Sequence, residues 1–418
     1  MVSQPVTDTS RTVILLGTFD SKGPEYAYLR QQLIDGGCDV IAVNVGILGT
    51  TDLFSVDIEA DQIARAAGAD LVSLAAHRDR GLGIRIMSAG AAAVVSELHE
   101  SRGIAGIIGT GGSGGTGIVT AAMRSLPIGV PKVCVSTVAS GNVAPYVGIK
   151  DIVMVPSIVD VSGLNAILKG VLSRAAGALC GMINAARTQP QGDRPLIAAS
   201  MFGNTTSCVD RCRVLLDEHG FETLVFHATG TGGRVLESLA DQNLVDGVLD
   251  ITTTEWADEL CGGIYTAGPE RLDAPGRRGI PHLIVPGCLD MCNFGPLGTV
   301  PDIYRSAGRQ LYEWSPEVTL MRTTSDENRR MGEIFARKVN EARGPVAVLI
   351  PLRGFSMLDG DGEKFCDRDA DRAFIVALKQ NLKPQIDVVE VDCNINDPMF
   401  ADQAVEMMLS LVRSRTRC

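Results

Sequence analysis

Residues 106–117 have the sequence Gly106-Ile107-Ile108-Gly109-Thr110-Gly111-Gly112-Ser113-Gly114-Gly115-Thr116-Gly117. The apolar start predicts a short strand, and the run Ile118–Arg124 after the glycines predicts a helix. A tight turn needs about one or two glycines, and each further glycine costs chain entropy on folding. The excess indicates that the backbone approaches a ligand closely, with successive amides and the helix dipole facing an anion. We predict a phosphate site formed by Gly111, Gly112, Ser113, Gly114, Gly115 and Thr116.

Short apolar runs alternate with amphipathic stretches on both sides of this loop, which is typical of βαβ units with parallel sheets. In the first half, strands are expected at Thr12–Leu16, Val40–Val45, Leu71–Ala75, Gly106–Ile108, Val133–Ser136 and Ile152–Val155. In the second half, they are expected at Leu196–Ser200, Leu224–Phe226, Val248–Ile251, His282–Val285, Val318–Met321, Val346–Ile350 and Val388–Val391. The glycine loop would then follow the fourth strand.

The two halves are separated by the polar, Pro-containing stretch Gln189–Pro195, which is typical of a domain boundary. After it the order strand, loop, helix, Gly, strand recurs, and either an internal repeat or the ordinary likeness of two βαβ units explains this. We predict an α/β fold of two doubly wound Rossmann-like domains, residues 1–190 and 191–418, with largely parallel sheets and an interdomain cleft.

Two further loops of the first half are expected to border the phosphate site, because ligands bind beyond the carboxyl ends of parallel strands. The turn after the first strand contributes Thr18, Phe19, Asp20 and Lys22, and the alternative is a capped helix start with solvated charges. The loop after Val133–Ser136 contributes Ser136, Ser140 and Gly141. No Walker spacing is present, and the glycine loop does not follow a first strand as the dinucleotide motif does.

The second half carries another set of candidate side chains at predicted strand ends, namely His227, Glu255, Asp290, Arg322 and Arg353. A His beside carboxylates suits general acid–base work, and two Arg suit a carboxylate or phosphate. Each one alone fits an ion pair or helix cap better, but as a set they predict a catalytic site for a small carboxylate or sugar acid.

Composition excludes several classes of protein. A net charge of −11 argues against general nucleic-acid binding, which needs clustered Lys and Arg. No apolar run reaches the roughly 18 residues of a membrane span. The eleven cysteines show no metal-binding spacing and indicate a reduced, cytoplasmic protein.

Several motifs together carry a resemblance, namely Gly17–Lys22, Gly111–Thr116, Phe226–Gly233, Asp250–Glu255 and Thr319–Thr324. In these the chain resembles the Tm-1-like ATP-binding domain family, bacterial and fungal proteins that share the amino-terminal domain of the tomato tobamovirus-resistance protein. The resemblance spans about Thr12 to Met407 and implies two α/β domains, ATP in the first domain, and a homodimer or higher homo-oligomer. Two places depart from the family pattern, Trp314-Ser315 and Asn394, where family members often have His.

These observations favour an ATP-binding protein, with Mg²⁺ expected at the phosphates because ATP normally carries it. Two alternatives stay open. One is an ATP-dependent, hydrolytic or lyase-type enzyme acting at the second domain, and the other is a non-catalytic, ATP-regulated interaction protein.

Overall fold

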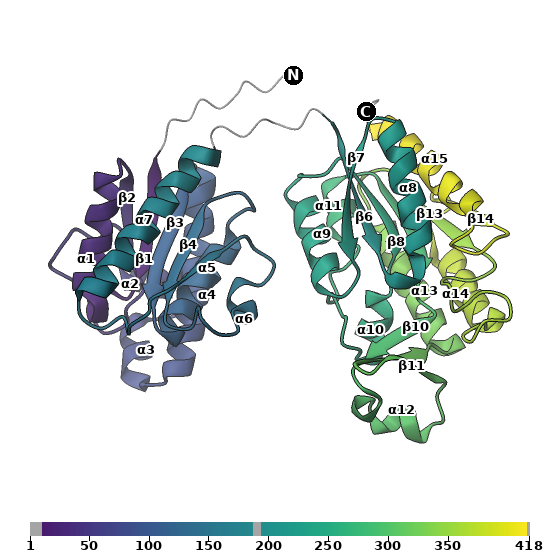
Figure 1. Cartoon of the computed structure of the whole chain (residues 1–418), viewed down its shortest axis with the longest axis horizontal. Coiled ribbons are helices and arrows are strands. Elements are labelled where there is room, and N and C mark those ends of the chain that lie inside the picture. The colour runs from purple at the N-terminus through teal and green to yellow at the C-terminus, as the bar shows by residue number, and fades with distance from the viewer. Residues whose placement is uncertain (1–10, 187–193, 416–418) are drawn as a thin grey trace. The chain divides into compact units, whose positions relative to one another are not determined.

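The computed structural model describes residues 11–186 and 194–415 of the chain. It divides into two compact units, Met1–Gln191 and Gly192–Cys418, each built around a parallel sheet (Figure 1). Most of the predicted boundary Gln189–Pro195 lies outside the described residues. The α/β fold with two largely parallel sheets is confirmed, whereas the interdomain cleft stays a prediction.

The first unit contains a five-stranded parallel sheet with the order β2-β1-β3-β4-β5. Its strands are β1 (Thr12–Gly17), β2 (Asp39–Asn44), β3 (Gly106–Gly111), β4 (Lys132–Ser136) and β5 (Val153–Pro156). Its helices are α1 (Phe19–Asp35), α2 (Ala60–Ala66), α3 (Leu71–His77), α4 (Arg80–Arg102), α5 (Ser113–Ser125), α6 (Ala144–Val147) and α7 (Ala166–Ala186).

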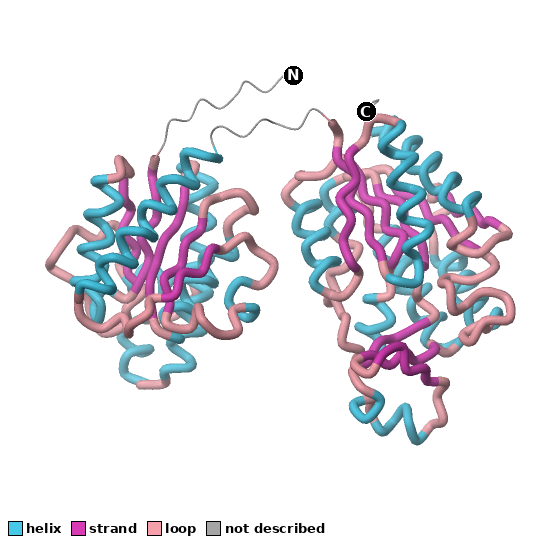
Figure 2. Tube along the Cα trace, in the orientation of Figure 1, coloured by secondary structure: helices cyan, strands magenta, loops and turns pink. Residues whose placement is uncertain are grey.

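Helices cover both faces of this sheet (Figure 2). Along β1, Val13 and Leu15 pack in the core formed with α1 and α7. Ile14 and Leu16 point to the opposite face and pack in the core formed with α2, α4 and α5. A strand buried on both faces requires a continuous apolar sequence, which is why β1 could be predicted from the sequence.

One predicted strand, Leu71–Ala75, is wrong because this segment forms helix α3. The Asp70 side chain accepts a hydrogen bond from the Ser73 N–H at 2.8 Å and caps the helix. A short apolar run suits either a strand or a helix, and the cap selects the helix here. The glycine loop therefore follows the third strand.

The second unit contains a six-stranded parallel sheet with the order β14-β13-β9-β8-β6-β7 and a separate antiparallel sheet with the order β10-β12-β11. The parallel strands are β6 (Leu196–Met201), β7 (Glu222–His227), β8 (Gly247–Thr252), β9 (His282–Gly287), β13 (Val346–Pro351) and β14 (Asp387–Val391). The antiparallel strands are β10 (Met291–Phe294), β11 (Leu311–Ser315) and β12 (Val318–Arg322). The strand predicted at Val318–Met321 thus belongs to a hairpin outside the main sheet.

The helices of the second unit include α8 (Thr206–Glu218), α9 (Thr231–Asp241), α10 (Glu255–Cys261), α11 (Ala274–Arg278), α12 (Asp302–Ser306), α13 (Ser325–Asn340), α14 (Arg368–Asn381) and α15 (Pro398–Arg415). Numbered from its own first strand, the large sheet has the order 2-1-3-4-5-6. The first unit has the order 2-1-3-4-5, so both units are wound in the same way.

Among the described residues, two helices are long and apolar enough to cross a membrane by length and composition alone, α4 and the segment Ala166–Ala185 of α7. Both instead place apolar side chains in the cores of the first unit, for example Met87 and Val95 from α4 and Leu172 from α7. Such packing is that of core helices in an α/β unit.

Candidate functional site

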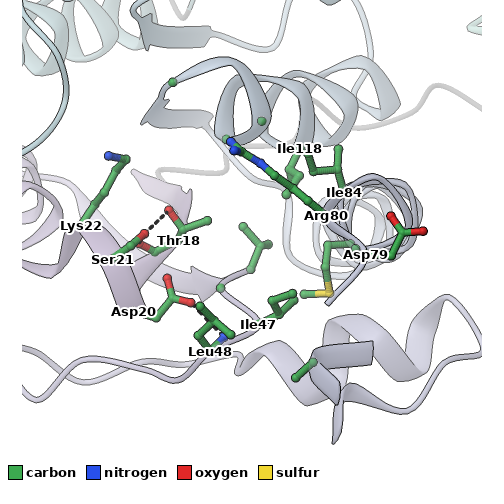
Figure 3. A pocket seen from close by; sticks show the side chains of 18 of the residues that line it. Thr18, Asp20, Ser21, Lys22, Ile47, Leu48, Asp79, Arg80, Ile84 and Ile118 are labelled. Carbon is green, nitrogen blue, oxygen red and sulfur yellow. Dashed lines mark hydrogen bonds between the residues drawn. The ribbon is translucent and has the colours of Figure 1, made fainter. Parts of the chain in front are cut away.

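A cavity of about 710 Å³ opens at the carboxyl edge of the first sheet (Figure 3). After β1 the chain continues into α1 on one face of the sheet, and after the neighbouring β3 it continues into α5 on the opposite face. Open α/β sheets bind ligands at such a topological switch point. The volume lies within the roughly 300–1,000 Å³ of small-molecule sites. The lining residues are Thr18, Asp20, Ser21 and Lys22 after β1, Val45, Gly46, Ile47 and Leu48 after β2, Gly112, Gly114, Gly115 and Ile118 after β3, and Ala75, Arg78, Asp79, Arg80, Gly83, Ile84 and Met87 from α3 to α4.

The amino terminus of α5 supplies backbone donors beside this cavity. Gly112 is its N-cap and brings no side chain to accept from the helix amides. The Thr116 N–H donates to the Gly112 carbonyl at 2.8 Å and so begins the helical hydrogen bonds. The N–H groups of Ser113, Gly114 and Gly115 come earlier and have no acceptor within the helix. Free amides of this kind, together with the helix dipole, are the features that suit an anion.

The glycines of the loop fall into two groups. Gly109 and Gly111 are required by packing, because a Cβ would lie 2.5 Å from the Leu16 carbonyl oxygen and 2.9 Å from the Gly115 Cα, respectively. At Gly112 and Gly115 the nearest atom to an added Cβ lies at 3.9 and 3.8 Å, and neither residue has a positive φ. Neither packing nor backbone conformation requires glycine there. Both residues line the cavity, and the missing side chains keep it open.

Arg80, near the start of α4, is a cation of this site that sequence reasoning missed. Its Nη2 atom lies 3.4 Å from the position of a Cβ on Gly114. Figure 3 shows its guanidinium pointing toward the start of α5. The side chain is exposed, and within residues 11–186 and 194–415 it has no hydrogen-bond or ion-pair partner. Its neighbour Asp79 caps α4 by accepting a hydrogen bond from the Leu82 N–H at 2.9 Å. This cap is local in the sequence and indicates that a helix begins at Arg80, but it does not indicate that Arg80 lies beside Gly114.

Lys22 is the predicted phosphate cation, but its ammonium donates to the Val161 carbonyl. In Figure 3 its side chain points away from Asp20. Asp20 itself accepts from the Leu48 N–H at 3.0 Å through Oδ2. A Cβ on Gly46 would lie 2.4 Å from the Asp20 carboxyl carbon, so the close approach of this carboxylate requires glycine there.

Other residues of the predicted phosphate set lie behind or beside the cavity. Phe19 is buried and packs edge-to-face on Tyr26, with ring centroids 4.9 Å apart. The hydroxyls of Thr116 and Ser136 are buried and lie 2.6 Å apart, which ties α5 to the end of β4. Ser113 and Gly141 are exposed. Ser140 lines a separate hollow of about 300 Å³ beyond β4 and β5.

Glu255 of the second unit belongs to a buried ion cluster. Its Oε2 accepts from the Arg271 Nε at 2.7 Å, and its Oε1 accepts from the N–H groups of Gly230 and Gly233 at 2.8 and 3.1 Å. Arg271 also pairs with Asp250. Burial alone would raise the pKa of Asp250, but the Arg271 guanidinium and His282 lower it well below its usual range. Glu255 thus fixes the loop that follows His227.

Asp290 and Arg322 lie together in a second buried cluster. Arg322 Nη1 donates to the Asp290 carbonyl at 3.4 Å, and Arg322 Nη2 pairs with Asp371 at 2.7 Å. The Ser356 hydroxyl donates to Asp290 Oδ2 at 2.8 Å. Burial raises the pKa of Asp290 to about 6, and burial together with the Asp290 carboxylate raises the pKa of Asp359 to about 9. At neutral pH the Asp359 carboxyl is therefore protonated, whereas Asp290 keeps most of its negative charge beside Arg322.

The remaining two candidates lie at the surface. His227 is exposed at the end of β7, with its ring centroid 5.4 Å from that of Phe202. Arg353 pairs with Asp392 at 2.8 Å, and both side chains are exposed. Among the residues that the structure describes, a hydrogen bond joins Asp290 to Arg322, but none joins this pair to the other three candidates. In the same residues, no cluster of three or more His, Cys, Asp or Glu could hold a metal.

The two departures from the family pattern lie in ordinary structural settings. Trp314 and Ser315 end strand β11. The Asn394 side-chain amide donates to the carbonyls of Arg353 and Ser356 at 3.1 and 3.0 Å and so ties together the loops after β13 and β14.

The fold and the cavity define a class, a two-unit, doubly wound α/β protein with a ligand-sized cavity at the switch point of its first sheet. Comparison with known proteins gives the family. Residues 11–188 match the model of the uncharacterised protein family (UPF0261) N-terminal domain, and residues 194–412 match that of the C-terminal domain. The chain belongs to the UPF0261 family.

Relatives at 41–43% identity cover 79–96% of the chain. A UPF0261 protein of Clostridium tetani is 43% identical over 404 residues, which are 96% of this chain and 99% of that protein. A UPF0261 protein of Mesorhizobium japonicum is 43% identical over 406 residues, 96% of this chain and 100% of that protein. The ToMV resistance protein Tm-1(GCR237) of Solanum lycopersicum is 41% identical over 342 residues, 79% of this chain and 45% of that protein. The kinship with the tomato protein expected from the motifs is confirmed.

Proposed function

We propose that the first unit binds ATP in the cavity at its switch point, with the phosphates at the start of α5. The observation that carries this proposal is the first turn of α5, where Gly112 and Gly115 face the cavity although neither packing nor backbone conformation requires glycine. Free amides at a helix terminus with room in front of them suit a phosphate. The kinship with the tomato protein adds support, because the resemblance implies ATP.

The other walls suit the rest of a nucleotide. Ile84, Met87 and Ile118 give an apolar surface for a base, and Arg80 gives a positive charge beside the glycines. Asp20 and Asp79 also line the cavity, and one or two carboxylates together with substrate phosphates are the usual protein environment of Mg²⁺. Mg²⁺ would offset phosphate charge here.

Gly115→Ala against Gly117→Ala tests the proposal. Both glycines lie in α5, and a Cβ at either position meets nothing closer than 3.8 Å, but only Gly115 lines the cavity. Alanine stabilises a helix interior by about 1 kcal/mol over glycine, so both variants should keep or raise the melting temperature of the free protein.

ATP at a hundredfold excess over Kd stabilises a protein by about 2.7 kcal/mol, which corresponds to about 5–10 °C for a unit of this size. We expect wild type and Gly117→Ala to show this shift, Gly115→Ala to lose most of it, and adenosine to give much less than ATP. An equal shift by ATP in Gly115→Ala would overturn the site, and the absence of any shift in wild type would overturn the function.

A further inference from the structure

The hollow of about 300 Å³ beyond β4 and β5 is separate from the nucleotide cavity. It is lined by Thr137, Ser140, Ser157, Ile158, Val159 and Asp160. It lies at the carboxyl ends of two neighbouring parallel strands, the edge where α/β sheets bind ligands. We propose that it is a subsite for a small, neutral, polyhydroxylated molecule such as a sugar or polyol.

The turn that forms one wall is held in a strained conformation. Ile158 has a φ of 67°, which is an outlier for a β-branched residue and costs about 1–3 kcal/mol. Its side chain is 74% exposed, so the strain does not serve the core. The Ser157 N–H donates to the Ser136 carbonyl at 3.1 Å, and the Ser157 hydroxyl donates to the Val159 carbonyl at 2.6 Å. Strain held in place by such contacts and not used for packing is typical of a binding loop.

The side-chain chemistry selects the ligand class. Thr137 and Ser140 bring hydroxyls and Asp160 brings a carboxylate, and none of the three side chains has a hydrogen-bond or ion-pair partner in the described ranges 11–186 and 194–415. Hydroxyls both donate and accept, and a carboxylate accepts from sugar hydroxyls. No Lys or Arg lines the hollow to balance Asp160, so an anionic ligand is disfavoured.

Two observations place this hollow close to the larger cavity. Gly112 lines the larger cavity, and a Cβ on it would lie 3.9 Å from the Thr137 hydroxyl. Lys22 also lines the larger cavity, and its ammonium binds the Val161 carbonyl one residue beyond Asp160. A polyol in the hollow would therefore lie beside the phosphate end of a nucleotide.

Methyl NMR of the full-length protein, labelled at the isoleucine δ1 carbons, tests both sites in one sample. Ile158 lines the hollow, whereas Ile84 and Ile118 line the larger cavity. The spectrum of Ile158→Val assigns the reporter peak. The probes are meso-erythritol, D-ribose and D-glucose, with D-gluconate as the charged comparison and ATP in a separate titration.

We expect at least one neutral probe to shift Ile158 saturably at millimolar concentration, and gluconate to bind about fivefold more weakly because of the Asp160 charge. Ser140→Ala should weaken the neutral probe several-fold, whereas Ser101→Ala, an exposed serine of α4, should not. Asp160→Asn should remove the discrimination against gluconate.

The proposal is overturned if no neutral probe moves Ile158 up to about 100 mM, a concentration far above weak millimolar affinity. Tighter binding of gluconate, or an equal effect of Ser101→Ala and Ser140→Ala, would overturn it as well. The outcome is independent of the nucleotide proposal, because ATP reports on Ile84 and Ile118. If a polyol moves the Ile158 signal but ATP does not move the signals of Ile84 and Ile118, the subsite is supported and the nucleotide site is contradicted.

Discussion

Removing the positive charge of Arg80 should weaken ATP binding, and the structure allows the size of the effect to be worked out. Arg80 Nη2 lies 3.4 Å from a Cβ position on Gly114. A phosphate oxygen accepting from the α5 amides at about 2.9 Å would therefore lie roughly 5 Å from the guanidinium. Two unit charges at that distance attract by about 3 kcal/mol at an effective dielectric constant of about 20.

Solvent screening reduces this figure because Arg80 is exposed. We expect Arg80→Gln to cost about 1–2 kcal/mol, which is about a 5- to 30-fold weaker Kd for ATP. Adenosine should be affected less than about twofold, because it carries no phosphate charge. The loss for ATP should shrink as salt is raised, since the charge is open to screening.

Isothermal titration calorimetry with ATP and adenosine at two salt concentrations measures these effects. Arg85→Gln is the matched control, because Arg85 is an exposed arginine of the same helix that does not line the cavity. Lys22→Gln should have the smaller effect on ATP, since the Lys22 ammonium is bound to the Val161 carbonyl. Equal losses in Arg80→Gln and Arg85→Gln would refute the reasoning, and a larger loss in Lys22→Gln would move the cation role back to Lys22.

Two predictions concern the second unit and are measured by urea unfolding. Burial raises the pKa of Asp258 to about 7 even though Asn293 and Tyr265 donate to it. Between its unfolded pKa of about 4 and pH 7 the folded state holds a proton that the unfolded state has lost, so stability falls as pH rises through this range, by up to about 4 kcal/mol. Asp258→Asn should flatten that slope, and an unchanged slope would contradict the assignment. Arg271→Met leaves Asp250 and Glu255 buried without their cation and should cost about 3–5 kcal/mol, whereas Arg277→Met, at an exposed pair, should cost less than about 1 kcal/mol.

The strands were predictable to the extent that their burial is visible in the sequence. β1 and β3 are buried along almost their whole length and have apolar or glycine residues at nearly every position. The segment Leu71–Ala75 is similarly apolar but forms α3. Its apolar run is too short to show whether the hydrophobic residues repeat with the period of a helix or of a strand, and the Asp70 cap favours the helix. Strand order depends on contacts between distant segments, so the switch point could not be located from the sequence.

The candidate site was predictable where the signal is local. The excess of glycines in residues 109–117 identified the loop, but the structure separates glycines required by packing, such as Gly109, from those that line the cavity, such as Gly115. The cation was not predictable. Lys22 is adjacent in sequence to the first loop and binds a carbonyl elsewhere, whereas Arg80 comes from a helix between β2 and β3. The direction of a long side chain depends on its neighbours in space.

The second unit contains a glycine-rich helix start of its own, and the two starts differ in what meets their amides. At the start of α9, the Glu255 carboxylate accepts from the Gly230 and Gly233 N–H groups, and Arg271 balances its charge. An internal carboxylate therefore occupies the place that an anionic ligand would take. At the start of α5 no side chain caps the helix, and Arg80, a cation beside it, has no partner among the described residues. Because a side chain of the chain itself satisfies the α9 terminus, anion binding in this protein is better sought at α5.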